Sequence, residues 1–218
     1  MFFTLPGMPY SLDPADRPDI ETVVKKSRFI ARVCRADGVD DATQLVAEAR
    51  RLHPDAGHHC FAYIIGDEPE SRIERSGDDG EPGGTAGLPM LQALKARELV
   101  NVAAVVSRYF GGVKLGAGGL ARAYSGAVTA AIETATLRPR VRWEVFRLEA
   151  DHGEAGRVES ELRSRGFEVT DVHYGERAAL TVACADADAL ASAVAEITAG
   201  RGNPVRLRHM WRTQRPVG

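Results

Sequence analysis

The C-terminal third of the chain carries the pattern that most restricts its fold, an alternation of strands and helices in the order βαββαβ. Its predicted strands share an apolar alternation, and they cover 143–151, 167–174, 178–184 and 204–212. Its predicted helices cover 153–165 and 186–199. This order is typical of the ferredoxin-like split βαβ motif, in which we expect the last strand to lie beside the first.

The preceding part of the chain predicts a second domain of mixed elements. Strands are expected within 20–33 and over 58–65, 71–76 and 101–110, and helices are expected over 40–53, 87–99 and 119–136. The fold class is therefore α+β with two domains, 19–138 and 139–218, joined by a linker at 137–142. The proline-containing stretch 1–18 is expected to be a flexible tail.

Composition excludes several classes of protein. No apolar run approaches the roughly 18 residues that span a bilayer, and the first residues lack the basic start of a signal peptide. The three cysteines, Cys34, Cys60 and Cys184, lie far apart without CxxC spacing, which favours a reducing cytoplasm over a disulfide framework. A net charge of −2 argues against coating nucleic acid through bulk charge alone.

A basic, glycine-rich stretch, RYFGGVKLGAGGLARAY, follows the strand at 101–110 and leads into the next helix; we call residues 108–124 the basic glycine segment. A helix start presents N–H groups without internal partners, and glycines let an anion approach them. The predicted anion or phosphate site consists of Arg108, Lys114, Gly116, Gly118, Gly119 and Arg122. The alternative is that the glycines serve only backbone geometry and packing.

Standard nucleotide motifs do not account for this segment. GAGGLA formally fits GxGxxA, but the expected acid about 20 residues later is missing, because Glu133 lies within the predicted helix. The GxxxxGK[ST] pattern of a P-loop is absent as well.

A second glycine-rich stretch is acidic: SGDDGEPGGTAGLPM, residues 76–90, is here called the acidic segment. Asp78, Asp79 and Glu81 have the ligand type that Mg²⁺ prefers, and beside an anion site they would suit a metal–phosphate complex. The same residues are also common in turns, where Asp accepts local N–H groups. We expect no cofactor, with Mg²⁺ as the open alternative.

No catalytic residue is predicted. Adjacent His58 and His59 on a strand point to opposite faces, which favours packed or hydrogen-bonded histidines over metal ligands. The hydroxyls of Ser76, Thr85 and Ser107 lack a GxSxG elbow or any sign of a triad.

Arginines gather near both ends of the C-terminal domain. Because the last strand should pair with the first, we expect a positive edge that includes Trp211 and the arginines Arg140, Arg142, Arg206, Arg208 and Arg212. Arginine with tryptophan suits RNA phosphates and stacked bases. The alternative is a charged edge that prevents sheet-to-sheet aggregation.

Taken together, GDDGEPGGTAGLPML, NVAAVVSRYFGGVKLGAGGLARAYSGA and the upstream HHCFAY resemble the IMPACT/YigZ family over roughly residues 20–138. The matching positions run from Asp78 to Pro82 and from Arg108 to Gly112, followed by Gly116, Gly118, Gly119, Leu120 and Arg122. The chain departs from many members at Gly77, where serine is frequent, and at Leu88, where a basic residue is frequent; the second change removes a phosphate contact.

The resemblance implies a ribosomal protein S5 domain 2-like domain followed by a ferredoxin-like domain, similar to domains IV and V of elongation factor G. Eukaryotic relatives regulate translation, but through an additional interaction domain, so their role is not carried over. Two functions are therefore expected. The first is a non-enzymatic cytoplasmic protein that binds RNA or the ribosome and regulates translation. The second is an enzyme or sensor of a phosphorylated small molecule, with Mg²⁺. The sequence leaves the oligomeric state open.

Overall fold

A computed structural model describes residues 8–214 and divides the chain into two compact units. The N-terminal unit extends to Arg140 and takes up the chain again at Thr213, whereas the C-terminal unit comprises Val141–Arg212. The two-domain α+β architecture expected from the sequence is confirmed. Among the described residues, no helix is both long and apolar enough to cross a membrane.

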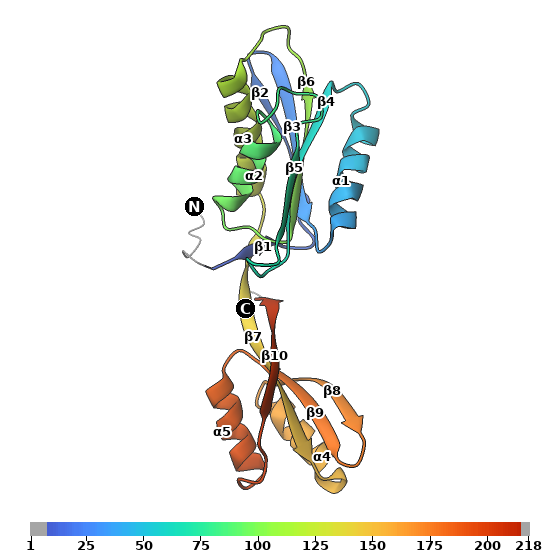
Figure 1. Cartoon of the computed structure of the whole chain (residues 1–218), viewed down its shortest axis with the longest axis vertical. Coiled ribbons are helices and arrows are strands. Elements are labelled where there is room, and N and C mark those ends of the chain that lie inside the picture. The colour runs from blue at the N-terminus through green and yellow to red at the C-terminus, as the bar shows by residue number, and fades with distance from the viewer. Residues whose placement is uncertain (1–7, 215–218) are drawn as a thin grey trace. The chain divides into compact units, whose positions relative to one another are not determined.

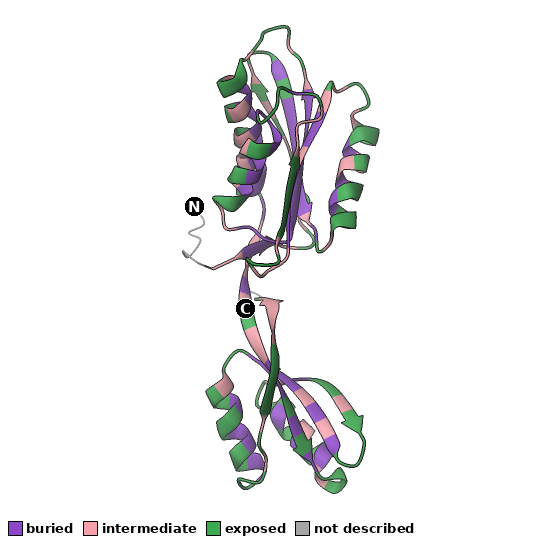
Figure 2. Ribbon diagram, viewed as in Figure 1, coloured by how far each residue is buried: buried purple, intermediate pink, exposed green. Residues whose placement is uncertain are grey.

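The N-terminal unit is built on a five-stranded sheet with the order β2-β3-β6-β4-β5. Its strands are β2 (Asp19–Val24), β3 (Ser27–Arg35), β4 (His58–Ile65), β5 (Ile73–Gly77) and β6 (Val102–Tyr109). All pairings are antiparallel. The central strand β6 is buried along most of its length because both faces of the sheet are covered (Figure 2).

Helix α1 (Val39–Leu52) lies on one face of this sheet, and α2 (Gly87–Lys95) and α3 (Ala117–Glu133) lie on the other (Figure 1). The α1 face encloses a small core that includes Leu45 and Val105. The opposite face encloses the main core, in which Phe29 packs edge-on against Tyr124 at a centroid distance of 5.1 Å. Apolar residues of α3 that recur at helical spacing are buried there: Leu120, Ala123, Tyr124, Ala127 and Ala131.

The C-terminal unit has the predicted βαββαβ order. After β7 (Leu137–Ala150) come α4 (His152–Ser164), β8 (Glu168–Tyr174), β9 (Ala178–Cys184), α5 (Ala187–Ile197) and β10 (Val205–Thr213). β7 lies between β9 and β10, and β8 pairs with β9, so the last strand lies beside the first as expected. Both helices contribute to one core with the inward residues of the sheet, including Leu148 and Leu180.

The structure differs from two expectations at the domain boundaries. The stretch 137–142 contains the boundary between the two units, Arg140 to Val141, as expected of a linker, but it is the first part of the 14-residue strand β7 and not an irregular segment. The expected tail 1–18 is structured where the chain is described: β1 (Tyr10–Leu12) is buried and pairs antiparallel with the start of β7, while 1–7 lie outside the described residues. Tyr10 also forms an isolated bridge with Leu99, which ties this segment to the N-terminal unit.

Candidate functional site

Residues 110–116 connect the end of β6 to the start of α3, and we call them the β6–α3 loop. Gly116 precedes α3 with φ = 73°, a conformation that glycine adopts without strain, and no side chain caps the helix start. Gly116 and Gly118 are exposed, and Gly119 is half-buried. From Tyr109 to Ile132 the sequence contains no carboxylate. The predicted open helix start is therefore present.

Lys114 and Arg122 are both exposed, and neither forms an ion pair with a described residue. Most arginines of the described chain differ in this respect, because they pair with an aspartate or glutamate. Lys114 and Arg122 are therefore the residues of the predicted anion site whose positive charge lies at the surface without an ion-pair partner among the described residues.

Arg108 does not belong to an exposed anion site, which corrects the sequence-based prediction. Its side chain is 7% exposed, and its Nη1 donates to Oε1 of Glu81 at 2.6 Å. The Tyr124 hydroxyl donates to the same oxygen at 2.6 Å. Burial, followed by the neighbouring Cys60 and Glu81, raises the pKa of Tyr124, so its hydroxyl remains a donor. The three side chains form a buried clamp between the acidic segment, β6 and α3.

The acidic segment is held by donors of its own chain. The Asp78 carboxylate accepts backbone N–H groups from Gly84 at 2.8 Å, Ala86 at 3.0 Å and Gly87 at 2.8 Å. Partial burial raises the pKa of Asp78, but these amides outweigh it and lower the pKa below its usual range. Asp78 therefore closes the segment and supports the start of α2, which is the turn function that the sequence left open.

Asp79 ties the acidic segment to α1 and β4. It accepts the Arg50 guanidinium at 2.5 Å and the backbone N–H of His59 at 2.7 Å. These two contacts outweigh the effect of burial and lower the pKa of Asp79. Nδ1 of His58 lies 2.8 Å from the Asp79 carbonyl and donates to it. Among residues 8–214, no group of three His, Cys, Asp or Glu side chains is placed to hold a metal ion.

The histidines occupy structural positions, as their place on a strand indicated. His59 is 4% exposed and its Nδ1 lies 2.9 Å from the Ser107 hydroxyl. Cys60 is buried beside them, and its thiol donates to the Asp78 carbonyl at 3.0 Å. Burial raises the pKa of Cys60 to about 12, so the thiol remains protonated at neutral pH and is a poor nucleophile.

The buried His59 predicts an acid-sensitive N-terminal unit. Burial, and then the charge of Arg50, lower the pKa of His59. The unfolded chain, with a histidine pKa of about 6.5, takes up the proton first, so stability falls as the pH drops below about 6.5. Hydrogen exchange of the β4 amides at pH 7.5, 6.5 and 5.5 measures this loss.

In the variant His59→Gln this pH-dependent loss of protection should be smaller. The matched control is His173→Gln, which removes an exposed histidine of β8 and leaves the contact with Ser107 in place. Protection of β4 that stays constant between pH 7.5 and 5.5 in the wild-type protein would show that the His59 charge is not linked to folding.

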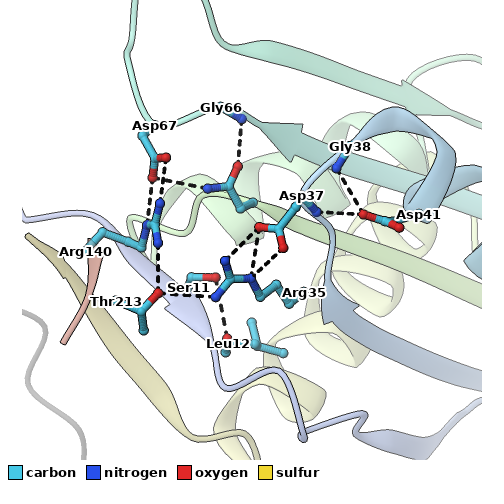
Figure 3. A network of polar contacts seen from close by, with 11 residues as sticks. Ser11, Leu12, Arg35, Asp37, Gly38, Asp41, Gly66, Asp67, Arg140 and Thr213 are labelled. Atoms are coloured by element: carbon cyan, nitrogen blue, oxygen red, sulfur yellow. Dashed lines mark hydrogen bonds and ion pairs between the residues drawn. The ribbon is translucent and has the colours of Figure 1, made fainter. Parts of the chain in front are cut away.

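Arg140, predicted to contact RNA, is a structural residue of the N-terminal unit. Figure 3 shows its guanidinium facing Asp67, with contacts of 2.8 and 2.7 Å, while Nη1 donates to the Thr213 hydroxyl at 2.8 Å. Arg35, itself paired with Asp37, donates to the same hydroxyl at 3.2 Å. Because Arg140 is only 7% exposed and fully engaged, it is not available to a ligand.

The remaining arginines of the predicted positive edge are partly neutralised. Arg206 pairs with Glu144 at 2.7 Å, Arg142 lies 3.4 Å from the same carboxylate, and Arg212 pairs with Glu168. Arg208 is exposed and has no ion pair with a described residue, and Trp211 is half-buried. The carboxylates of Glu144 and Glu168 therefore neutralise only part of the charge of this edge, because Arg142 and Arg206 share Glu144 and Arg208 keeps its own charge.

Sequence reasoning missed the turn between β2 and β3, where Lys25 and Lys26 lie beside the β6–α3 loop. Both lysines are exposed, and neither forms an ion pair with a described residue. Phe110, in the same region, is 61% exposed. The available signal was the pair of lysines between two β-branched strands, which marks a hairpin turn but does not show which loop the turn contacts.

Comparisons with known proteins agree with the family resemblance. The family model described as the Impact N-terminal domain matches residues 25–132, and a domain of unknown function, DUF1949, matches residues 148–201. The chain is 42% identical over 156 residues to the IMPACT family member YvyE of Bacillus subtilis, covering 72% of this chain and 71% of that protein.

The IMPACT family member YigZ of Escherichia coli is 37% identical over 172 residues, which cover 79% of this chain and 84% of that protein. A solved structure described as the crystal structure of an hypothetical protein aligns with a TM-score of 0.71 and 33% identity, over 92% of this chain and 98% of that one. Both units of the fold thus have a solved counterpart.

Proposed function

The chain belongs to the IMPACT family, and on that premise we propose that it is a non-enzymatic RNA-binding protein that acts in translation, with the β6–α3 loop and the start of α3 as its RNA contact. The cytoplasm, where such RNA is found, is the proposed location. The translational role follows the resemblance to elongation factor G domains, and the RNA contact rests on the local chemistry described above.

One observation carries the RNA proposal: unpaired cations and an uncapped helix start occur together on a surface segment without carboxylates. Lys114 precedes α3, and Arg122 lies in its second turn. Exposed N–H groups with the positive end of the helix dipole attract phosphate oxygens, and the two side chains add full charges. RNA supplies such phosphates in series, and neutralising them releases bound counterions.

The alternative, an enzyme or sensor of a phosphorylated small molecule with Mg²⁺, is less well supported. The carboxylates of Asp78, Asp79 and Glu81 are all committed to N–H, guanidinium or hydroxyl donors of the chain. Binding a metal there would require breaking these contacts. A thermal-shift screen with nucleotides tests the alternative, since a ligand at 100 times its Kd stabilises the fold by about 2.7 kcal/mol. A shift that needs both nucleotide and Mg²⁺ would favour it.

The salt dependence of RNA binding tests the proposal. We expect the affinity of the wild-type protein for single-stranded RNA to fall with salt by about 0.7 log unit per log unit of salt for each neutralised phosphate. The double variant Lys114→Ala, Arg122→Ala should lower this slope by about 1.4, because two contacts are lost. Fluorescence anisotropy of a labelled oligonucleotide at several salt concentrations provides the measurement.

A matched control removes two other unpaired cations of the same unit. Arg51 in α1 and Arg75 in β5 are exposed and form no ion pair with a described residue, so Arg51→Ala, Arg75→Ala changes the net charge equally. This control should keep the wild-type slope. If both double variants and the wild type show the same dependence of affinity on salt, the β6–α3 loop is not the RNA contact. A wild-type protein that binds no RNA would contradict the proposed function.

A further inference from the structure

We propose that the turn between β2 and β3, together with the β6–α3 loop, forms a subsite for single-stranded RNA, in which Phe110 stacks on a base and the lysines of the turn hold phosphates. This inference rests on the proposed RNA-binding function and adds that the protein prefers single-stranded RNA to duplex RNA. We call the residues concerned, Lys25, Lys26, Phe110, Val113 and Lys114, the turn–loop surface.

The turn and the loop are in direct contact. The backbone N–H of Gly111 donates to the Ser27 hydroxyl at 3.1 Å, and Arg28 lies opposite Tyr109 in the ladder between β3 and β6. A side chain at position 111 would place its Cβ 2.0 Å from the carbonyl carbon of Lys26. The absence of a side chain at Gly111 therefore lets the backbone of the turn pack against the loop one residue after Phe110.

The turn holds its lysines in an unusual backbone conformation. Lys25 and Lys26 have φ values of 46° and 68°, as in the two-residue hairpin turns where Asn and Gly are strongly preferred. Lysine at both positions carries a conformational cost, and residues kept in such conformations tend to occur at functional sites. The nearest acid of the hairpin, Glu21, accepts two bonds from Arg28, which leaves both lysine charges unneutralised.

Phe110 is an exposed ring with a fixed support. Its centroid lies 5.6 Å from the guanidinium carbon of Arg108, and that guanidinium also lies 5.5 Å from the ring of Phe29. Arg108 is in turn held by Glu81. An aromatic ring supported in this way loses little conformational entropy on binding, and Val113, 41% exposed, extends the apolar surface on the same loop.

Single-stranded RNA is the occupant that matches both properties. Cations without carboxylate partners complement a chain of phosphates, and an exposed aromatic ring stacks only on a base that is free of its own duplex. Duplex RNA would satisfy the lysines but would leave Phe110 without a base. The surface therefore predicts a preference for single strands.

The test compares a labelled uridine oligomer of about 12 nucleotides with a duplex of the same length, using the full chain. Phe110→Ala should weaken binding of the single strand about 5- to 150-fold, the range for one lost base stack. Phe110→Trp, which retains an aromatic ring, should keep the wild-type affinity or exceed it. Lys25→Ala, Lys26→Ala should lower the salt slope by about 1.4.

Tyr174→Ala is the matched control, because Tyr174 is a similarly exposed aromatic residue (60%) in the C-terminal unit. It should bind as the wild type does. Wild-type binding that is unchanged in both Phe110→Ala and Lys25→Ala, Lys26→Ala overturns the inference and leaves the proposed function standing. Equal affinity for the strand and the duplex also overturns it. If the wild-type protein binds neither the single strand nor the duplex, both the proposed function and this inference are wrong.

Discussion

Replacing Glu81 by alanine should destabilise the N-terminal unit by about 3–5 kcal/mol, the cost of removing one partner of a buried ion pair. The Glu81 side chain is 3% exposed, and its Oε1 accepts both Arg108 and Tyr124. Without it, a guanidinium whose Nε already lacks a partner is left in the core with a buried hydroxyl. Hydrogen exchange of the β6 amides measures the loss.

Glu133→Ala is the control for this variant. Glu133 pairs with Arg97 at 2.9 Å, but its side chain is 59% exposed, and such surface pairs contribute less than about 1 kcal/mol. Both tryptophans, Trp143 and Trp211, lie in the C-terminal unit, so their fluorescence reports whether that unit stays folded. A Glu81→Ala protein as stable as Glu133→Ala would show that the clamp does not support the N-terminal fold.

Replacing Gly111 by alanine should affect both stability and RNA binding. The new Cβ would lie 2.0 to 2.3 Å from backbone atoms of Lys26 and Ser27, which cannot rotate away. The loop or the turn must therefore move, at a cost of about 1–3 kcal/mol as for other overpacked sites, and the bond to Ser27 is strained or lost. Since this contact packs the turn against the loop one residue after Phe110, we expect single-strand affinity to fall by about 10-fold or more, as for a lost stack.

Gly126→Ala separates this effect from a general glycine effect. Gly126 lies within α3, and a Cβ added there would meet no atom within 4 Å outside the local helix backbone. Alanine at this position should leave RNA binding unchanged and stabilise the helix by up to about 1 kcal/mol. Thermal unfolding and anisotropy on both variants provide the comparison, and a Gly111→Ala protein that equals the wild type in both would contradict the proposed contact between turn and loop.

The sequence predicts the fold well where periodicity is strong. HHCFAYII matches the bounds of β4, and the βαββαβ order of the C-terminal unit follows from alternation and helical spacing alone. The sequence does not reveal the strand at LRPRVR, residues 137–142, because Pro139 and three arginines interrupt the apolar alternation of a strand. The partner of this first part of β7 is β1, which lies more than a hundred residues away in the sequence. Strand β1, within residues 8–14, could not be predicted either, because this short proline-containing sequence has low β-strand propensity.

The candidate site was predicted only in part. The open start of α3 follows from glycine placement, and so does the presence of Lys114 and Arg122 there. The pairing of Arg108 with Glu81 could not be predicted, because it joins residues 27 positions apart across a loop and a strand. The contact between Gly111 and the β2–β3 turn links positions 84 residues apart, which local patterns do not encode.

Photo-crosslinking tests the central claim most directly, that the turn–loop surface binds single-stranded RNA. The full chain is irradiated with a single-stranded oligonucleotide that contains 4-thiouridine, and the attached peptides are mapped by mass spectrometry. We predict crosslinks at Phe110 and within residues 25–28, which are lost when unlabelled single strand is added in excess. Crosslinks confined to 205–212 of the C-terminal unit, or no crosslinks at all, would contradict the account.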